Sequence, residues 1–434
     1  MPGMRQRVWR NLRVLGGGSA FASLLSLLAT VINSRALSIV DLGTFILLQS
    51  SALLLIGLAT LSTQQPIIKM GVAALHAGDT KRFEGLVALG LLVDLASALV
   101  AGTLGLFLVF WLPDWLGIPE NRIAPAAIVA GSLFLQGYKT SEGIFRAFNR
   151  FDMLARTLVA VALLQLAAAV LLWALDAPFI WYGGLAAMVL ALPSVLQLLL
   201  SLRLMRQHGL RLHGGALKVA RRDRREFAWY CSVTGLTGSL DSLRMNADTM
   251  LIGVLISIEG AGLYGVAKQL AGVVRKGTVI YSSVLFPEIA AMSARNERQG
   301  ISRILRSATQ ASFAATAVLI GGTWLLGELA LSLLFGEQFT AAHSALNLLI
   351  VAAGLQVASA TYSMALQAFI RPIALLYVYL FASFVFLAAV WPGLIFLGLP
   401  GAGFAQILFV IALGAACALL LRREGVIGGV EHAN

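Results

Sequence analysis

Long, nearly uninterrupted runs of apolar residues divide this chain, and short polar segments separate them. The runs 86–112 and 158–175 are typical. They are continuous, and a helix needs about 20 mostly apolar residues to cross a bilayer core. A membrane β-barrel would instead show alternating polarity in segments of about ten residues. The pattern therefore predicts an all-α polytopic membrane protein.

Twelve membrane helices are predicted. Their ranges are 14–33, 43–63, 86–112, 123–141, 155–175, 179–202, 228–256, 262–290, 308–334, 343–367, 373–397 and 403–421. The first range follows four arginines, as a signal peptide would. It is longer than the apolar region of such peptides, which has about 7–15 residues. We therefore expect an uncleaved first membrane helix.

The composition excludes a soluble enzyme. In a membrane protein, the distribution of the positive charges predicts the orientation of the chain. Hydrophobic residues make up 59% of the chain and charged residues only 12%, whereas a soluble domain is about a quarter charged. Of the 32 Lys and Arg residues, 26 fall on one side of the predicted helices, and only Arg35 and Arg122 fall on the other. The positive-inside rule makes the basic side cytoplasmic, with both termini on it. The net charge of +12 therefore does not indicate a nucleic-acid partner.

The two halves of the chain repeat. Residues 38–45 match 257–264 at an offset of 219, and residues 147–150 match 368–371 at an offset of 221. Leu116-Gly117 and Phe335-Gly336 also match, and Pro66 and Pro287 are similarly spaced. We expect an N-terminal six-helix bundle over 1–205, a basic cytoplasmic linker over 206–227 that contacts anionic lipids, and a C-terminal six-helix bundle over 228–434. Parallel repeats of this kind build transporters with a cavity between the halves.

Six charged residues lie well inside the predicted seventh and eighth helices, away from their ends, where each charge costs about 2.5–3.5 kcal/mol. They are Asp241, Arg244 and Asp248 in the seventh helix, and Lys268, Arg275 and Lys276 in the eighth. The first three are spaced to pair along one helix face. Two interpretations stay open. Asp248–Lys268 and Asp241–Arg275 are structural ion pairs, or the surplus cations line a cavity that attracts an anionic substrate.

Three more charged residues lie in or beside apolar runs. Asp94 and Glu328 either carry a coupling proton or lie near an interface, and Arg35 either lines the cavity or extends to the lipid head groups. The five histidines fall in predicted loops or the tail, apart from His343 at the start of a predicted helix. Cys231 and Cys417 fit no metal spacing. We expect no catalytic residue, no metal site and no cofactor.

Several short motifs resemble those of bacterial polysaccharide flippases, the lipid-linked oligosaccharide exporters of the MATE-like (multidrug/oligosaccharidyl-lipid/polysaccharide) superfamily. The segments are 34–37 (SRAL), 43–45 (GTF), 246–253 (NADTMLIG), 261–264 (AGLY), 286–288 (FPE) and 334–339 (LFGEQF). Arg35 and Asp248 match motif positions. The resemblance implies two six-helix bundles in a V, with a cavity that opens alternately to either side of the bacterial cytoplasmic membrane.

The implied cargo is a polyprenyl-pyrophosphate-linked oligosaccharide for the assembly of O-antigen, capsule or exopolysaccharide. Cationic residues of the cavity would hold its anionic part, which makes Arg35, Arg244, Lys268, Arg275 and Lys276 the expected binding residues. Asp94, Asp241, Asp248 and Glu328 are the expected coupling or ion-pair residues. The implied partners are membrane lipids, a coupling ion (proton or sodium) and other polysaccharide assembly proteins.

Two other functions compete with this hypothesis. A membrane glycan polymerase or ligase would need an extracytoplasmic site for acid–base or metal chemistry. The predicted outer loops are short, and the histidines fall in loops, in the tail or at one helix start, which argues against it. A drug exporter of the same fold would carry small cations, which a cationic cavity would repel. Unpaired Asp94, Asp241 or Asp248 would favour such a cargo.

Overall fold

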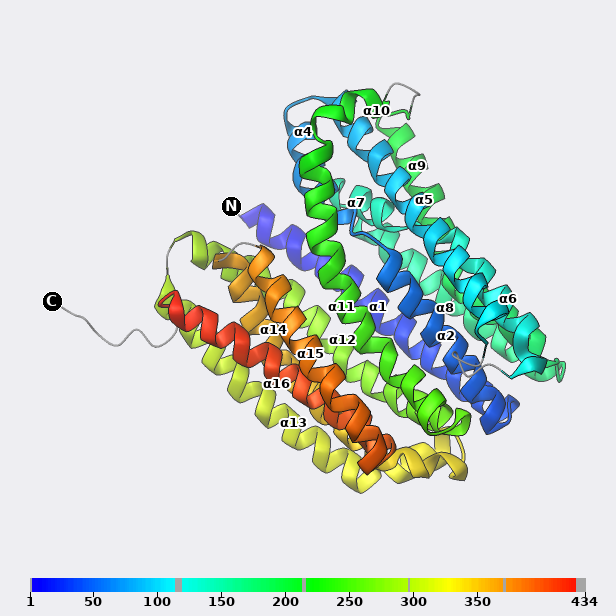
Figure 1. The fold of residues 1–434 in the computed structure, drawn as a ribbon. Coiled ribbons are helices and arrows are strands. Elements are labelled where there is room, and N and C mark those ends of the chain that lie inside the picture. Colours follow the sequence, from blue (N-terminus) through cyan, green and yellow to red (C-terminus); the bar gives the residue numbers. More distant parts are fainter. Residues whose placement is uncertain (1, 114–118, 213–215, 296, 370–371, 427–434) are drawn as a thin grey trace. The chain divides into compact units, whose positions relative to one another are not determined.

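The computed structural model describes residues 2–113, 119–212, 216–295, 297–369 and 372–426, which contain helices and no strand. The chain forms two compact units (Figure 1). Unit 1 comprises residues 1–12, 37–43 and 251–434, and unit 2 comprises residues 13–36 and 44–250. Unit 2 thus includes most of the predicted seventh helix, so the units differ from the two halves of the repeat. The division at 206–227 stays a prediction.

Unit 2 is built mainly from long helices joined by short, irregular segments, and the terminal parts of three of these helices, residues 2–12, 39–43 and 251–255, belong to unit 1. Its elements are α1 (Pro2–Ala36), α2 (Ile39–Ala59), α3 (Gln64–Pro66), the π-helix η1 (Ile67–Gly71), α4 (Val72–His76), α5 (Thr80–Trp111), η3 (Glu120–Arg122), α6 (Ile123–Ser132), η4 (Leu133–Leu135), α7 (Lys139–Ala147), α8 (Phe151–Ala174), α9 (Phe179–Gln207), α10 (Ala216–Val219), η5 (Ala220–Arg222) and α11 (Arg224–Leu255). Within the unit, α6 packs against α5 and α9, and α8 packs against α9.

Unit 1 contains the remaining helices. They are α12 (Ile258–Ala294), α13 (Arg298–Leu334), η6 (Glu337–Ala342), α14 (His343–Phe369), α15 (Pro372–Leu397) and α16 (Leu399–Arg423). The central helix α14 packs against α12, α13 and α16, and α16 also packs against α15.

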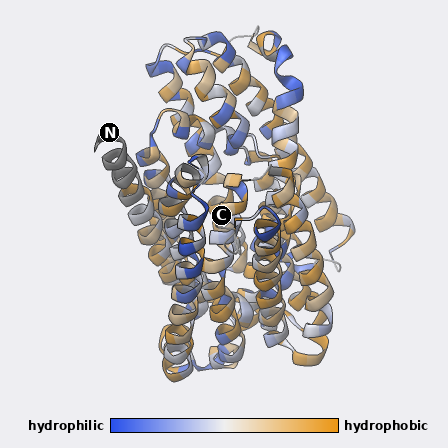
Figure 2. Cartoon of the chain, turned by 90° about the vertical axis from the view of Figure 1, so that its left-hand side faces the viewer, coloured by the Kyte–Doolittle hydropathy of each residue, from blue (hydrophilic) through white to orange (hydrophobic). Residues whose placement is uncertain are grey.

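Apolar side chains cover much of the exterior of both units, and Figure 2 shows the hydrophobic colour along most of the helix length. On α13 and α15 the exposed fractions reach 72% for Trp324, 70% for Phe384 and 82% for Phe396. Nine helices of the described residues are long and apolar enough to cross a membrane. Such an exterior suits lipid rather than water, so the chain is a multi-pass membrane protein.

Ten of the twelve predicted helices are continuous, and the predictions over 43–63 and 123–141 were wrong in that respect. The helix α2 ends at Ala59, and the pass over 123–141 is interrupted at residues 136–138 between η4 and α7. Tertiary hydrogen bonds hold the chain at both breaks. Gln136 Nε2 donates to the Leu190 carbonyl over 2.7 Å, and the Ser62 amide donates to the Cys231 carbonyl over 3.4 Å. Broken backbone at membrane depth is stable only where protein or water satisfies it.

The first repeated segment forms the same local structure twice within unit 1. Ser38 Oγ accepts a hydrogen bond from the Asp41 amide, and Ser257 Oγ accepts one from the Gly260 amide. The two repeat-related glycines lie against one another. A Cβ atom on Gly262 would lie 3.1 Å from backbone atoms of Gly43, and one on Gly43 would lie 2.1 Å from the Ile258 carbonyl oxygen. Position 43 therefore requires glycine for this close approach, and a side chain at position 262 would be tight.

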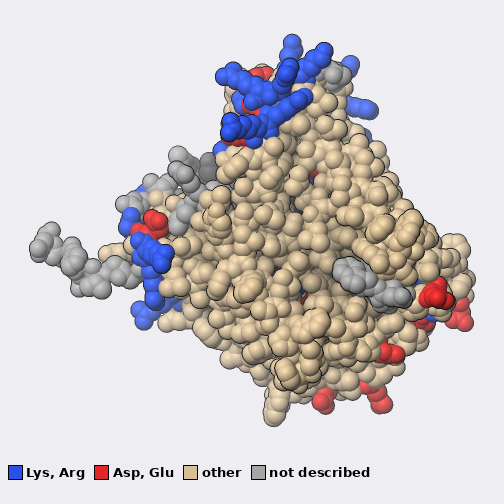
Figure 3. All heavy atoms as spheres, viewed as in Figure 1, with Lys and Arg blue, Asp and Glu red and all other residues tan. Residues whose placement is uncertain are grey.

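The basic linker is attached to unit 2 at the end that carries α4 and α10, where Lys and Arg side chains gather (Figures 1 and 3). There α10 packs on α5. The Arg82 guanidinium makes two hydrogen bonds of 2.8 Å to the buried carboxylate of Asp223. Glu84 accepts a hydrogen bond from the Arg211 amide over 2.6 Å. The linker is thus held to α5 by paired charges as well as by packing.

Candidate functional site

A polar cavity lies within unit 2 beside both helix breaks. Its volume is about 260 Å³, and its lining comes from α2, the segment after α2, the start of α7, and α11. The polar lining residues are Thr60, Ser62, Tyr138, Lys139, Thr234, Ser242 and Asn246. A smaller hollow of about 10 Å³ shares Thr60, Tyr138 and Lys139 with the cavity and is also lined by Asp94. Leu53, Ile56 and three glycines also line the larger cavity, so the breaks place polar side chains on the wall of a partly open cavity that is otherwise largely apolar.

Asp94, on α5, joins the two breaks. Its carboxylate is 3% exposed. Thr63 Oγ1 donates to Asp94 Oδ1 over 2.8 Å, and the Thr140 amide donates to Oδ2 over 2.9 Å. Thr140 Oγ1 also donates to Thr63 Oγ1 over 3.0 Å. The first turn of a helix has amides without helical partners, and Tyr138 before α7 supplies no side-chain cap. Asp94 supplies that cap from another helix.

Lys139 lies next to this junction and presents the cavity with a cation. Its Nζ lies 3.7 Å from Glu142 Oε2 and 4.5 Å from the centre of the Tyr138 ring. Beside them, Gln64 bridges Glu142 and Arg146 when its amide is oriented with Nε2 3.1 Å from Glu142 Oε2 and Oε1 2.8 Å from Arg146 Nε. Basic and acidic groups therefore alternate around the start of α7.

The predicted site residues of α11 are neighbours in sequence of Ser242 and Asn246, which line the same cavity. Arg244 is 3% exposed and forms the local pair that the spacing allows, with its Nη2 2.9 Å from Asp241 Oδ1. Asp248 is fully buried, and its Oδ1 accepts a hydrogen bond of 2.7 Å from the Thr249 amide. Since the cation of Arg244 is paired with Asp241 on the same helix, its charge is at least partly compensated.

The predicted site residues of α12 belong to unit 1. Lys268 is half-buried, with its Nζ 5.6 Å from the centre of the Tyr264 ring. Arg275 is half-buried and Lys276 is exposed within the chain. Asp241 and Asp248 belong to unit 2, so the pairs Asp241–Arg275 and Asp248–Lys268 stay predictions.

The other two predicted residues lie on exposed surface. Arg35 occupies the last turn of α1 and is exposed. Glu328, on α13, is also exposed, and its Oε1 lies 3.4 Å from Nδ1 of His343. His343 is half-buried at the start of α14 and also contacts the Thr323 carbonyl over 2.8 Å. In the described part of the chain, His, Cys, Asp and Glu residues form no group that could hold a metal ion.

The sequence interpretation missed Lys139, Thr63 and Thr140 as part of a site. Lys139 was counted there only as one of the 26 basic residues that predict the membrane orientation. A signal was present, because the run Gln136-Gly137-Tyr138-Lys139-Thr140 is polar inside an otherwise apolar span. Glycine-interrupted spans mark binding sites in many transporters.

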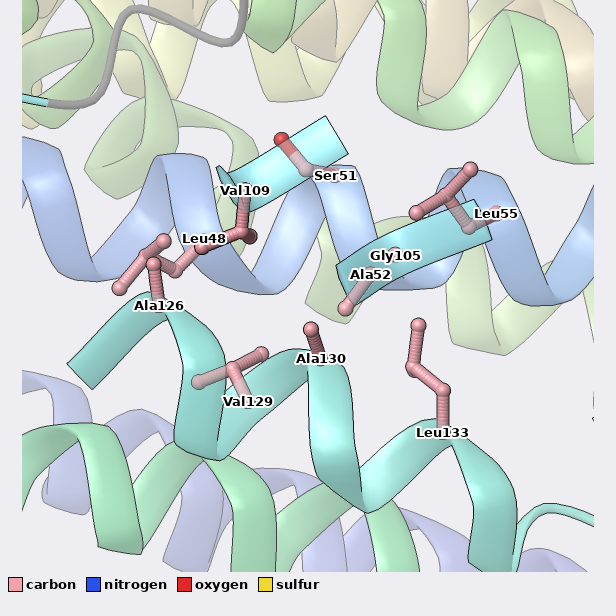
Figure 4. A pocket seen from close by; sticks show the side chains of 10 residues that line it. All are labelled: Leu48, Ser51, Ala52, Leu55, Gly105, Val109, Ala126, Val129, Ala130 and Leu133. Atoms are coloured by element: carbon pink, nitrogen blue, oxygen red, sulfur yellow. The ribbon is translucent and has the colours of Figure 1, made fainter. Parts of the chain in front are cut away.

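A second cavity in unit 2 is unsuited to a polar ligand. It lies among α2, α5 and α6, and Figure 4 shows its lining of aliphatic side chains with Ser51 at one side. Its volume is about 20 Å³, which is enough for no more than one or two waters. We interpret it as a packing defect between helices.

Comparisons with known proteins agree with this architecture. Residues 90–344 match the model of a family described as polysaccharide biosynthesis protein. The inner membrane protein YghQ of Escherichia coli (strain K12) is 24% identical over 348 residues, which are 79% of this chain and 96% of that protein.

Two solved structures show the fold. An inward-facing multidrug resistance transporter of the MATE family has a TM-score of 0.76 at 14% identity, covering 93% of this chain and 94% of that one. The lipid II flippase MurJ, in an inward closed conformation, has a TM-score of 0.69 at 13% identity, covering 95% of this chain and 88% of that one. Because the family model spans more than half of its length, this chain belongs to the polysaccharide biosynthesis protein family, and it has the fold of MATE transporters.

Proposed function

We propose that this protein moves a polyprenyl-pyrophosphate-linked oligosaccharide across the bacterial cytoplasmic membrane during surface polysaccharide assembly. The observation that carries the proposal is the cavity of unit 2, which has several polar side chains on its wall and is lined in part by two broken helices, in a chain of this family. An apolar exterior with a polar interior lets a lipid tail stay in the bilayer while a polar head passes through protein. The MATE fold supports movement by alternating access.

The charged residues divide between two roles in this proposal. Arg244, Lys268, Arg275, Lys276 and Arg35 bind the anionic part of the cargo. Asp94, Asp241, Asp248 and Glu328 pair with these cations or carry the coupling ion, a proton or sodium. The halves 1–205 and 228–434 move relative to one another around the cargo.

The proposed location is the cytoplasmic membrane with both termini in the cytoplasm. The similarity to an inner membrane protein of Escherichia coli supports the membrane, and the one-sided distribution of Lys and Arg supports the orientation. Membrane lipids and other polysaccharide assembly proteins are the proposed partners.

Reconstitution tests the proposal. The purified full chain is placed in liposomes containing a lipid-linked oligosaccharide that carries a fluorophore on the sugar, and a membrane-impermeant reductant bleaches label in the outer leaflet. Transport is expected to expose the inner-leaflet label to bleaching. Protein-free vesicles are the baseline.

Two outcomes would contradict the proposal. One is bleaching no faster than in protein-free vesicles. The other is equally fast bleaching of a fluorescent phosphatidylcholine, which would indicate general lipid scrambling. Chromatography of the lipid afterwards tests the enzyme alternative, because a polymerase or ligase would lengthen or remove the glycan.

A further inference from the structure

We propose that the polar cavity of unit 2 binds a sugar ring of the cargo and not its pyrophosphate. This inference rests on the proposed function and adds that the sugar and the pyrophosphate of the cargo bind at different places. The sugar subsite consists of Tyr138, Lys139, Thr234, Ser242 and Asn246, which all line the cavity.

The charge of the cavity suits a neutral ligand. Among the described residues that line it, Lys139 is the one with a charged side chain, and Glu142 Oε2 lies 3.7 Å from its Nζ. The adjoining hollow adds the carboxylate of Asp94. A pyrophosphate bound here would meet one cation with two carboxylates close by. Buried anions need an excess of paired cations, and this cavity does not supply it.

The hydrogen-bonding groups of α11 also favour a ligand that donates hydrogen bonds. Thr234 Oγ1 donates its proton to the Tyr230 carbonyl over 2.6 Å, and Ser242 Oγ donates its proton to the Leu53 carbonyl over 3.1 Å. Each hydroxyl has one proton and two lone pairs, so what remains toward the cavity is an acceptor. Asn246 uses Nδ2 for its hydrogen bonds to Ser242, which leaves Oδ1 as a further acceptor.

A pyrophosphate oxygen can only accept hydrogen bonds, so it does not match this wall. A sugar hydroxyl both donates and accepts, so it can donate to the acceptors of α11 and accept from Lys139. The half-buried Tyr138 ring adds an apolar face, and the volume of about 260 Å³ approaches the lower end of small-molecule sites, near 300 Å³. Donor, acceptor, charge and size together favour one sugar unit.

Two threonines one turn apart on α11 provide a matched test. Thr234 and Thr237 each donate a hydrogen bond to the carbonyl four residues earlier, but only Thr234 lines the cavity. The variants are Thr234→Val and Thr237→Val, each in the full-length purified chain. Asn246→Leu removes the Oδ1 acceptor, and Asn246→Asp keeps an acceptor there and adds a negative charge. Thermal unfolding in detergent confirms that each variant is folded.

Binding is measured with two synthetic lipids of equal chain length, a short polyprenyl pyrophosphate bearing one N-acetylhexosamine and the same pyrophosphate without sugar. Thr234→Val and Asn246→Leu are expected to raise the Kd of the sugar-bearing lipid about threefold to tenfold each, since each removes one hydrogen bond. The Kd of the bare lipid is expected to change less than about twofold. Thr237→Val is expected to leave both values nearly unchanged.

The outcomes separate this inference from the proposed function. Equal weakening of both lipids by Thr234→Val, or equal effects of Thr234→Val and Thr237→Val, would overturn the sugar subsite and leave the transporter proposal intact. If neither lipid bound the unaltered chain, the proposed function itself would fail. If tetraphenylphosphonium bound, and bound more tightly to Asn246→Asp, the cavity would be a cation site.

Discussion

Asp94 shows how a single carboxylate can hold two interrupted helices together inside an apolar protein. It accepts from Thr63 and from the Thr140 amide, and it is almost fully buried. We expect Asp94→Leu to lower the free energy of unfolding by about 2–4 kcal/mol, because two donors lose their acceptor. Thermal unfolding of the purified chain in detergent measures the loss.

Two further variants test whether the hydrogen bonds are responsible. Asp94→Asn keeps one acceptor oxygen and is expected to cost about 1 kcal/mol. Ser97→Ala, one turn along the same helix, removes only a 3.5 Å bond from the Leu61 amide and is expected to cost less than about 1 kcal/mol. If Asp94→Leu lowered the free energy of unfolding no more than Ser97→Ala does, the claim that Asp94 holds the two breaks together would be contradicted.

The same residues show which part of the site could be predicted from the sequence. The pair Asp241–Arg244 follows from helical spacing alone, because both partners lie on one helix. Asp94 stood out as an acid in an apolar run. Its partners could not be predicted, because Thr63 and Thr140 lie 31 and 46 residues away and reach it only through the two breaks.

Among the elements, helix existence could be predicted and helix continuity could not. Apolar runs of about 20 residues specify a membrane pass, so ten predicted helices are continuous and the outline of the fold is correct. The breaks depend on tertiary hydrogen bonds instead. Ser194 Oγ and the Leu190 carbonyl bind the two ends of the Gln136 amide. Both partners lie more than 50 residues away, and a local pattern does not contain them.

The contact between the repeat-related glycines gives a prediction for the start of α2. Gly43→Ala would place Cβ 2.1 Å from the Ile258 carbonyl oxygen, so backbone would have to move. We expect a loss of about 1–3 kcal/mol in the free energy of unfolding. Gly184→Ala, in α9, is the control because nothing lies within 4 Å of its added Cβ. Its thermal stability is expected to be unchanged or slightly higher. Equal stability of both variants would argue against the close contact.

The attachment of the basic linker to α5 gives a second prediction at this scale. Asp223→Ala removes the acceptor of both Arg82 hydrogen bonds. We expect trypsin to cleave the linker about fivefold faster, because local opening that is easier by about 1 kcal/mol raises the open population by that factor. The time course of cleavage on a gel measures it. Glu297→Ala removes an exposed pair with Arg295 and is the control. Cleavage of the linker at the unaltered rate in Asp223→Ala would contradict the attachment.

Across the whole molecule, basic residues occur in two settings that a net charge cannot separate. Most lie in short polar segments, where the positive-inside rule predicts that they set the orientation in the membrane. A few lie along membrane helices, and some of these have acidic neighbours, as Arg244 has Asp241 and Lys139 has Glu142. If the cavity of unit 2 holds a sugar, the anionic part of the cargo needs cations elsewhere. Arg275 and Lys276 on α12 are the candidates.

The double variant Arg275→Gln/Lys276→Gln tests this assignment. We expect transport of the lipid-linked oligosaccharide to fall at least about tenfold, because each charged hydrogen bond to phosphate contributes about 1.5–3 kcal/mol. Folding is expected to persist.

The matched control is Arg221→Gln/Arg222→Gln, which removes the same charge from exposed linker residues and is expected to transport normally. Since both pairs change the net charge equally, a difference between them must come from position. Normal transport by the α12 variant would remove Arg275 and Lys276 from the site, and equal losses in both variants would assign the effect to net charge.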